Sequence, residues 1–560
     1  MKTTIPSFLT ALICLGLLPK TQAVRPPPGG GYAGGNTAEG QDALLSLSTG
    51  FYNTGIGIYS LLSVTDGNFN TGVGAGTLLA NTANDNTATG AGALLSNTIG
   101  SENTGNGAFA LFLNTTGSEN TAVGFGTLFN NTTGSDNTAN GESALYYNTT
   151  GNFNTASGSH ALYYNTTGTS NTATGLNALQ NNTTGNENTA TGAIALKSNT
   201  TGFSNTAHGA NALAGNTEGL DNTAVGKNAL VENTIGSFNT AVGWQALQNN
   251  VTGYVNTAVG IGALAGNTSG QSNTAVGADA LNSNTDGSNN TAIGADALAD
   301  NTTGTSNTAV GWQALQNNIN GPSDTAVGVG ALFSNTSGEG NTAVGVNALE
   351  ANTEGSHNTA IGLQALTSNT TGSDNIALGF DAGLSVTTAD RVICIGVNGQ
   401  DVSNSCYIGN IWNQPGGSQA VYVDSSGKLG AQVSSRRFKD EIKPMEQASE
   451  VIYRLKPVSF RYKPQIEPTR PLCFGLVAED VENVNPDLVV RDKEDKPYSV
   501  RYDQVNAMLL NEFLKEHAKV QDLEKRMATL TARLEEQAAQ IRKVTTQLQV
   551  SASTADIVSN

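Results

Sequence analysis

A repeat of seventeen residues dominates this chain and limits what it can fold into. The phrase N-T-A-x-G-x-x-A-L-x-x-N-T-T-G-x-x first begins at Asn36 and occurs 21 times, the last copy beginning at Asn375. Gly holds the fifth position in all 21 copies, and Leu holds the ninth in 20 of them. The step from Asn70 to Asn86 is one residue short, and Asp324 replaces the first Asn once. Such a short fixed period predicts a solenoid, whose units bury their apolar faces only against their neighbours.

The chemistry of the repeat predicts which kind of solenoid it forms. Each copy carries two turn signals, Gly at position 5 and N-T-T-G at positions 12 to 15, and the segments between them are too short for helices. Thr, Ala and Val before the Gly suit a short strand, and the Gly supplies a corner with positive φ. We therefore expect a mostly β chain, with a parallel β-solenoid or β-roll over residues 36–392. Its coils would lie about 4.8 Å apart, for a length on the order of 100 Å.

Individual repeat positions predict which side chains face inward. Asn at positions 1 and 12 is expected to form side-chain ladders rather than binding sites. Position 3 is Ala or Gly, which predicts a close approach, and the Ala-Leu pair at positions 8 and 9 is assigned to the core. Position 4 is often polar in the early copies, as in Glu39 and His208, but is aliphatic from Val225 to Leu378. A core would not tolerate such polar groups, so position 4 is expected to face outward and, in the C-terminal half, to pack on another chain.

The repeat resembles the heads of trimeric autotransporter adhesins. Those heads are left-handed β-rolls built from short N-S-V-A-I-G-x-x-S units, and the similar phrase here is N-T-A-V-G-x-x-A-L, as in residues 239–247. The resemblance covers the whole solenoid, although the period is longer here. It implies a trimeric fibre.

The N-terminal residues predict export. Residues 1–23 have the features of a secretory signal peptide, with Lys2, an apolar stretch over residues 5–18 and a T-Q-A cleavage site. Residues 24–35 are rich in Pro and Gly and are interpreted as a linker. The expected location is therefore secreted or at the cell surface, with no membrane span in the mature chain.

Charge and cysteine content narrow the function further. Residues 24–430 hold 5 basic and 25 acidic side chains, whereas residues 431–560 hold 20 of each. A long acidic solenoid argues against nucleic acid or an anionic membrane as partner. No metal site or cofactor is expected. Cys394 and Cys406 lie in similar phrases and could pair in an oxidising compartment, and Cys473 then leaves an odd thiol.

After residue 433 the repeat stops, and charged residues and helix signals replace it. A long helix is expected from residue 503 to about 549, with apolar residues at heptad spacing over 516–549 and Gln537 as the one polar station. A coiled coil is more consistent with this pattern than a helix packed on its own domain. The other elements expected are a helix at 446–455 and strands at 458–462, 474–478 and 498–502. The expected divisions are a neck of divergent coils at 393–433, a small α+β domain at 434–515, the coiled coil at 516–549 and a disordered tail at 550–560.

The sequence of this second part resembles the C-terminal intramolecular chaperone domain, a self-cleaving serine peptidase, of endosialidase-type phage tailspikes and tail fibres. The phrase S-S-R-R-F-K-D-E-I at 434–442 is similar to the family's S-D-x-R-x-K-x-x-I signature. Four further motifs follow in the family's order, together with the helical tail. They are L-K-P-V-S-F-R-Y at 455–462, F-G-L-V-A-E-D-V at 474–481, N-P-D-L-V at 485–489 and S-V-R-Y-D at 499–503.

The resemblance implies that the domain drives trimerisation of the fibre before it and then cuts itself off in a single turnover. The implied cut lies between Val433 and Ser434, with Ser434 as nucleophile and Lys439 as general base of a Ser-Lys dyad. Ser435 stands where the family usually has Asp, and it is a rival nucleophile. Cys473 stands where many members have His. The alternative is a domain that keeps trimerisation and has lost cleavage.

The function expected from these features is a secreted or cell-surface homotrimeric fibre of adhesin type. Its partners would be its own copies, with host or cell-surface glycans or proteins as ligands. The alternatives are a prophage-type tail fibre that binds a receptor and a structural fibre that does not cleave. A polysaccharide-degrading enzyme is disfavoured because no repeat position carries a carboxylate in successive coils. Tyr146-Tyr147, Tyr163-Tyr164, Trp244 and Trp312 could stack on sugars, but stacked structural rings are the favoured interpretation.

Overall fold

The computed structural model describes residues 32–411, 421–423, 427–431, 433–492 and 494–555. The expected signal peptide, most of the expected linker and the last five residues of the expected tail therefore lie outside the described residues. By its internal contacts the chain divides into two units, residues 1–414 and residues 415–560, and each is described by itself.

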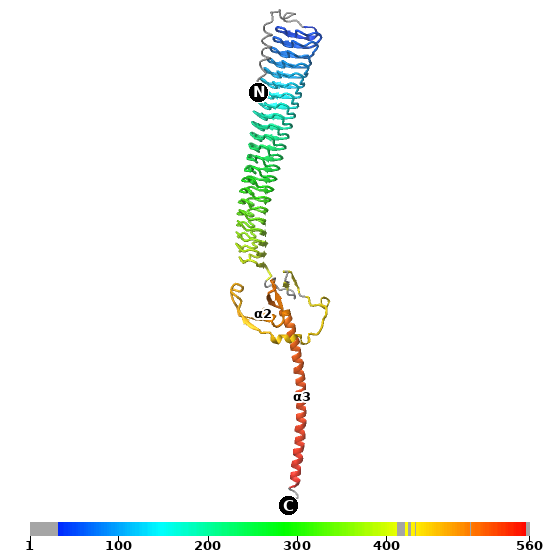
Figure 1. Ribbon diagram of the computed structural model, residues 1–560, viewed down its shortest axis with the longest axis vertical. Helices are drawn as coiled ribbons and strands as arrows, with labels where there is room; N and C mark the ends of the chain where they lie inside the picture. The colour runs from blue at the N-terminus through cyan, green and yellow to red at the C-terminus, as the bar shows by residue number, and fades with distance from the viewer. Residues whose placement is uncertain (1–31, 412–420, 424–426, 432, 493, 556–560) are drawn as a thin grey trace. The chain divides into compact units, whose positions relative to one another are not determined.

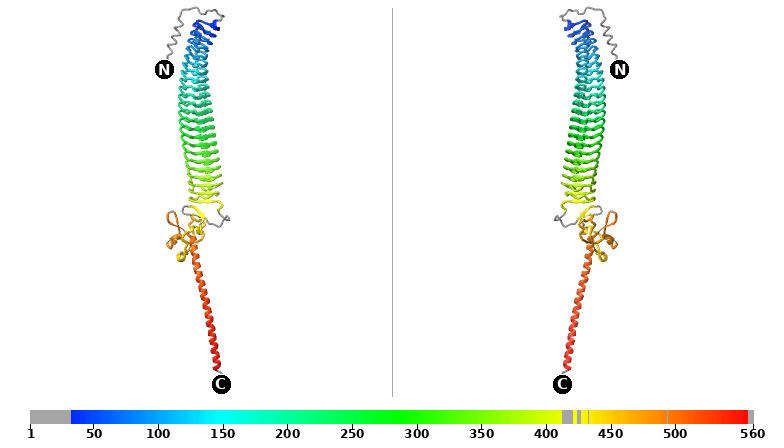
Figure 2. Two further views of the ribbon diagram at one scale, coloured as in Figure 1. Left: turned by 90° about the vertical axis from the view of Figure 1, so that its right-hand side faces the viewer. Right: turned by 90° about the vertical axis from the view of Figure 1, so that its left-hand side faces the viewer.

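The first unit is a parallel β-solenoid, which confirms the expected fold class. Each coil contributes one three-residue strand, and 23 such strands form a single sheet. Figure 1 and Figure 2 show the coils stacked in sequence order from blue to yellow-green. The strands, preceded by the 3-10 turn η1 (Ala33–Gly35), are β1 (Thr37–Glu39), β2 (Thr54–Ile56), β3 (Thr71–Val73), β4 (Thr87–Thr89), β5 (Thr104–Asn106), β6 (Thr121–Val123), β7 (Thr138–Asn140), β8 (Thr155–Ser157), β9 (Thr172–Thr174), β10 (Thr189–Thr191), β11 (Thr206–His208), β12 (Thr223–Val225), β13 (Thr240–Val242), β14 (Thr257–Val259), β15 (Thr274–Val276), β16 (Thr291–Ile293), β17 (Thr308–Val310), β18 (Thr325–Val327), β19 (Thr342–Val344), β20 (Thr359–Ile361), β21 (Ile376–Leu378), β22 (Ile393–Ile395) and β23 (Cys406–Ile408).

The register of the sheet follows the repeat. Each strand pairs in parallel with the next at the same repeat position, as Thr240 does with Thr257. The short step between Asn70 and Asn86 leaves this register intact, since Thr71 still pairs with Thr87. The missing residue is therefore absorbed in the turn and not in the strand.

The interior of the solenoid is lined by small residues, Leu and Asn, as expected. In one coil Ala241, Ala246 and Leu247, at positions 3, 8 and 9, have no exposed surface. The two Asn ladders are also confirmed. The Nδ2 of Asn239 donates to the Oδ1 of Asn222 at 3.1 Å, and the Nδ2 of Asn250 donates to the Oδ1 of Asn233 at 2.7 Å. These bonds satisfy polar groups that would otherwise be costly to bury.

Two further repeat positions behave as the sequence predicts. The Gly at position 5 has positive φ throughout the stack, 139° at Gly243, and a Cβ there would lie 2.3 Å from the carbonyl oxygen of Gly260 in the next coil. Position 4 faces outward: Val242 and Val344 are 36% and 37% exposed. In the same strands the preceding residue, at position 3, is buried.

The possible pairing of Cys394 with Cys406 is wrong. In the β22–β23 ladder Cys394 lies opposite Tyr407, and Cys406 lies opposite Ile393. The two cysteines are thus one register step apart, and their side chains point to opposite faces of the sheet. Cys394 is buried and Cys406 is exposed, and both are free thiols, as is Cys473. Burial raises the pKa of the Cys394 thiol, and the nearby Cys406 adds to this effect.

The second unit holds short elements followed by one long helix. The expected helix at 446–455 is a 3-10 helix, and the sequence analysis did not predict α2 or β28. The strands form three antiparallel pairs, β24 with β25, β26 with β27 and β28 with β29. The elements are β24 (Val421–Val423), β25 (Leu429–Ala431), η2 (Arg436–Phe438), η3 (Glu446–Arg454), β26 (Val458–Phe460), β27 (Cys473–Gly475), α2 (Ala478–Glu482), η4 (Pro486–Leu488), β28 (Val489–Arg491), β29 (Pro497–Val500) and α3 (Tyr502–Ala555).

The core of the second unit is small. Only five hydrophobic side chains are buried in one cluster among the residues described there, with seven partly buried ones packed around them. The buried five are Val451, Val481, Leu488, Val489 and Val500. Figure 1 shows α3 extending beyond this cluster as a single helix. A core of this size can stabilise only a small domain by itself. We call the short elements from η3 to β29, residues 446–500, the lobe.

Candidate functional site

The structure brings the two predicted catalytic residues together on one tight turn. Ser435 precedes the 3-10 turn η2, whose backbone N–H of Phe438 donates to the Ser435 carbonyl at 3.0 Å. The N–H of Lys439 donates to the Arg436 carbonyl at 3.1 Å. This turn directs the Lys439 side chain back along the chain, where its Nζ donates to the Oγ of Ser434 at 3.3 Å. The two side chains are thus within hydrogen-bond reach of each other, although a general base would have to accept the Ser434 proton and not donate to its oxygen.

The surroundings of this pair are open to solvent and include large apolar side chains. Ser434 and Lys439 are both exposed, and so are the neighbouring Val433, Phe438 and Ile442, at 56%, 54% and 49%. A lysine can accept a proton only in its neutral form, which burial favours. The turn therefore has the contact of a dyad, whereas the burial that would activate it is not supplied by this chain's own described residues.

Ser435 and Cys473 are the two residues that depart from the family's usual sequence. Ser435 is exposed, and its side chain makes no capping hydrogen bond to η2. Cys473 begins β27, and its Sγ lies 3.6 Å from the Pro471 carbonyl oxygen. Within the part of the chain that is described, no hydrogen bond joins either residue to Lys439.

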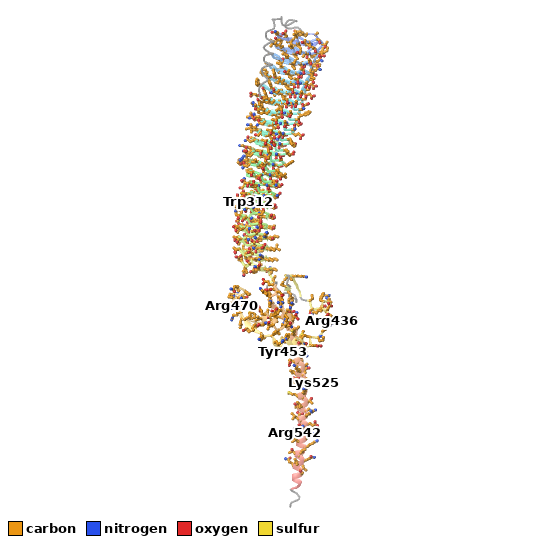
Figure 3. The ribbon with its side chains drawn as sticks, viewed as in Figure 1. Trp312, Arg436, Tyr453, Arg470, Lys525 and Arg542 are labelled. Atoms are coloured by element: carbon orange, nitrogen blue, oxygen red, sulfur yellow. The ribbon has the colours of Figure 1, made fainter. Side chains whose placement is uncertain are left out.

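A buried carboxylate fixes η3 to the start of α3. Glu512 is 5% exposed, and it accepts hydrogen bonds from the hydroxyls of Ser449 and Tyr453 on η3. Lys515 donates to it at 2.6 Å, and Asn511 donates to Ser449 at the same distance. The bonds from Lys515 and Ser449 lower the pKa of Glu512 to about 2. Figure 3 places Tyr453 where the lobe meets α3. This network could not be predicted from local sequence patterns, because Ser449 and Glu512 are 63 residues apart.

Many large apolar side chains of the second unit are exposed. In the lobe, Phe474 is 78% exposed, Tyr498 75% and Ile466 69%. Along α3 the predicted heptad stations are exposed as well, between 48% and 67%. These stations are Val520, Leu523, Met527, Leu530, Leu534, Ile541, Val544 and Leu548. Exposed apolar surface of this density marks a protein interaction surface.

The aromatic residues on the early coils form a structural stack and not a sugar-binding platform. Phe129 lies 5.1 Å from Tyr146 with planes 10° apart, and Tyr146 lies 5.3 Å from Tyr163 with planes 19° apart. Tyr147 and Tyr164 stack at 5.5 Å. The rings cover one another's faces, which are the surfaces a sugar would need. Burial, with a contribution from Tyr147, raises the pKa of Tyr163 to about 12.

The described residues contain neither a metal-binding cluster nor a membrane-spanning helix. No group of three or more His, Cys, Asp and Glu side chains there could hold a metal ion. No helix in the described part of the chain is long and apolar enough to cross a membrane.

Comparison with known proteins identifies one part of the chain. Residues 434–490 match the model of the family described as chaperone of endosialidase. The match begins at Ser434 and includes η2, η3, α2 and η4, so the resemblance of the second unit to this type of C-terminal chaperone is confirmed. No curated protein matches the chain. A long β-solenoid followed by a chaperone-of-endosialidase segment fits a phage tail fibre-like protein.

Proposed function

We propose that this chain is an exported, homotrimeric fibre whose C-terminal segment first assembles the fibre and then releases itself by cutting before Ser434. The observation that carries the proposal is the hydrogen bond from Lys439 to Ser434 at the first residues of the family match. The solenoid would be the lasting fibre, and residues 434–560 would be the part removed.

Self-association is supported by the apolar surface of the second unit. Chaperone-of-endosialidase domains act in trimerisation, and the match covers residues 434–490 of this unit. The exposed heptad stations of α3 suit a coiled coil, in which each apolar residue inserts between side chains of the neighbouring helices. Three copies joined in this way would also cover Phe438 and Ile442, the apolar neighbours of the dyad.

Assembly would therefore control the cut. The Ser434–Lys439 pair of one chain is open to solvent, so nothing in the single chain desolvates it. Covering the turn with neighbouring chains would supply the missing desolvation. Cleavage would then follow trimerisation, so that release happens only after the chaperone has acted.

The chemistry at the bond is an acyl transfer to the residue's own hydroxyl. Neutral Lys439 takes the proton from the Oγ of Ser434, which attacks the carbonyl carbon of Val433. The carbon–nitrogen bond breaks as Lys439 returns the proton to the Ser434 nitrogen, which leaves an ester and a free amine. Water then hydrolyses the ester, giving the Val433 carboxylate and restoring the Ser434 hydroxyl.

The first test is the fate of the chain on expression from residue 24. We expect two fragments on a denaturing gel, with intact masses that correspond to a cut between Val433 and Ser434. Ser434→Ala and Lys439→Ala should each give one uncut chain. Ser435→Ala is the matched control and should cut normally.

Each outcome of this test decides between alternatives. If Ser435→Ala is uncut and Ser434→Ala is cut, the neighbouring serine is the nucleophile. If the wild-type chain stays whole but sediments as a trimer, the protein is a fibre that does not cleave, and the autoproteolysis proposal fails. A monomeric wild-type chain would overturn the trimer itself.

The location is proposed from the sequence. Residues 1–23 have the features of a signal peptide, so we propose that the fibre is secreted or held at the cell surface. A prophage-type tail fibre that binds a receptor is the second candidate, favoured by the family match. Mass spectrometry of the N-terminus from culture medium separates the two, because only an exported chain begins at Val24.

A further inference from the structure

The second half of the solenoid carries an apolar strip that the sequence analysis recognised only in part. Position 4 was expected to be aliphatic there, but position 6, just beyond the corner glycine, is also apolar in the same coils. Nine successive coils, those that begin at Asn239 through Asn375, have apolar residues at both positions. We call these residues the strip: Val242, Trp244, Val259, Ile261, Val276, Ala278, Ile293, Ala295, Val310, Trp312, Val327, Val329, Val344, Val346, Ile361, Leu363, Leu378 and Phe380.

The strip is open to solvent in the single chain. At position 6, Trp244 and Trp312 are 50% and 53% exposed, and Phe380 is 65% exposed. Figure 3 labels Trp312 in the part of the stack that carries the strip. Nine coils at about 4.8 Å give a length of roughly 40 Å, and two side-chain columns give a width of about 10 Å. An area on the order of 400 Å² is within the range of the largest apolar patch on a typical monomer, which is often functional.

We infer that the strip faces the common axis of the fibre, where it packs against the same strip of the other copies of this chain; this rests on the proposed trimer. In a parallel assembly with rotational symmetry, equal residues of each chain lie at equal heights. The strip has one pair of side chains per coil, so a second copy matches its period along the whole length.

Charge restricts where a second copy can approach. Residues 24–430 hold 25 acidic and 5 basic side chains, so two such solenoids repel each other across most faces. The strip contains no charged residue. The acidic side chains of the same coils lie at other repeat positions, as Asp279 and Asp296 do at position 7 and Glu339 does at position 16. The strip is thus a face along which identical acidic chains can approach.

The same two columns are polar in several early coils. Asn140 and Glu142 occupy positions 4 and 6 of one coil, and Ser157 and Ser159 occupy them in the next. The apolar contact therefore covers the half of the solenoid nearest in sequence to the chaperone segment. Assembly that starts at the chaperone would meet the strip first.

Cysteine cross-linking tests this arrangement in the full chain with Cys406 and Cys473 replaced by Ser. Val276→Cys and Val344→Cys, both at position 4, should form covalent dimers on oxidation or with a short bis-maleimide. Because three thiols meet at the axis and two react, about two thirds of the chains should be linked. Gln271→Cys and Glu339→Cys, both at position 16, are the matched controls and should stay unlinked.

The sedimentation of each variant separates the possible failures. A monomer would overturn both the proposed trimer and the strip contact. A trimer in which the position 16 thiols link, or no thiol links, would overturn the strip contact and leave the trimer standing.

A second pair of variants checks the energetic role of the strip. Val276→Lys places a charge at the axis and should lower the melting temperature of the trimer. Thr174→Lys makes the same change at position 4 of an early coil, outside the strip, and should leave the melting temperature unchanged. Equal effects of the two variants would contradict the proposal.

Discussion

At the scale of single residues, the Leu at position 9 of each coil has a strained backbone and a buried side chain. Leu247 has a φ of 51°, and the Leu at position 9 of the other coils has similar values. A non-glycine residue in this region costs about 1–2 kcal/mol. Burying a Leu side chain completely contributes roughly 1.5–3 kcal/mol, which offsets that cost. The sequence pattern predicts that this Leu is buried but not that its backbone is left-handed, because the stacking of whole coils imposes that conformation.

Asp324 is the one carboxylate in the Asn ladder at position 1. Its Oδ1 accepts from the backbone N–H of Asn341 at 2.8 Å, and its Oδ2 accepts from Asn335 at 3.1 Å. In the next coil the Nδ2 of Asn341 donates to the carbonyl oxygen of Gly355 at 2.9 Å. An ionised carboxylate has no proton to donate, so Asp324 can make the equivalent bond only when it is protonated. Burial raises its pKa from 3.8 to about 7, against the opposing hydrogen bonds from Asn341 and Asn335.

We therefore expect this coil to lose stability as the pH rises. Since the folded pKa lies above the unfolded one, the stabilisation from the bound proton is complete below about pH 4 and is lost as the pH passes 7. The loss is of the order of 2–4 kcal/mol. Hydrogen exchange of residues 320–345 should be faster at pH 8 than at pH 5 after correction for intrinsic rates, and Asp324→Asn should remove the difference. A wild-type chain with equal protection at both values would contradict this account.

At the scale of elements, the two units differ in how much could be predicted from sequence. The strands, Asn ladders and Ala-Leu interior of the solenoid follow from the period, because every contact repeats between neighbours. The strip at position 6 was missed because Lys227 and Glu142 interrupt its column elsewhere. In the second unit the pair Ser434 and Lys439 was named from the family resemblance, whereas the Glu512 network depends on residues that are far apart in the chain. The exposure of Ser434 and Lys439 could not be predicted either, because the signature motif fixes their spacing and not what packs against them.

The last regular coil is closed by one side chain. The Oδ1 of Asp401 accepts the backbone N–H groups of Thr387, Thr388 and Ala389 at 2.8–2.9 Å, and its Oδ2 accepts the Thr387 hydroxyl at 2.6 Å. In the coil before, the N–H of Thr370 donates instead to the carbonyl oxygen of Thr387. The Asp401 carboxylate thus takes the place of the backbone carbonyl that a regular N-T-T turn would supply in the following coil.

Asp401→Ala should open this end of the solenoid. Burial alone would raise the pKa of Asp401, but the hydroxyl and amide donors of Thr387 and its neighbours outweigh it and lower the pKa. The stabilisation is therefore present above about pH 4 and is lost only as the pH falls well below that value. At pH 7 we expect faster hydrogen exchange at residues 387–389 in Asp401→Ala. Glu354→Ala, which removes an equal charge from an exposed turn, should leave these amides protected. Equally fast exchange in the two variants would contradict the role of Asp401 as a cap.

At the scale of the whole molecule, the repeat makes the solenoid divisible into equal parts. Register is kept from coil to coil, and even the short step after Asn70 is absorbed in a turn. Deleting residues 239–306, four whole coils, should leave the fold intact and shorten the solenoid by about 19 Å. Electron microscopy of the fibre measures the length, and circular dichroism checks the fold. Deleting residues 239–302 instead breaks the period and should disrupt the stack, and a fully folded product would contradict this expectation.

The direction of the hydrogen bonds between coils has a mechanical consequence. Bonds such as Thr223 N–H to the Asn239 carbonyl join one coil to the next, so they lie along the stack. When the two ends of one solenoid are pulled apart, the coils at the ends separate first, and the others follow one after another. Each released coil adds roughly 50 Å of extended chain, about ten times the length it occupied. A fibre under pull would therefore lengthen in small steps and dissipate work at each one, rather than break at once.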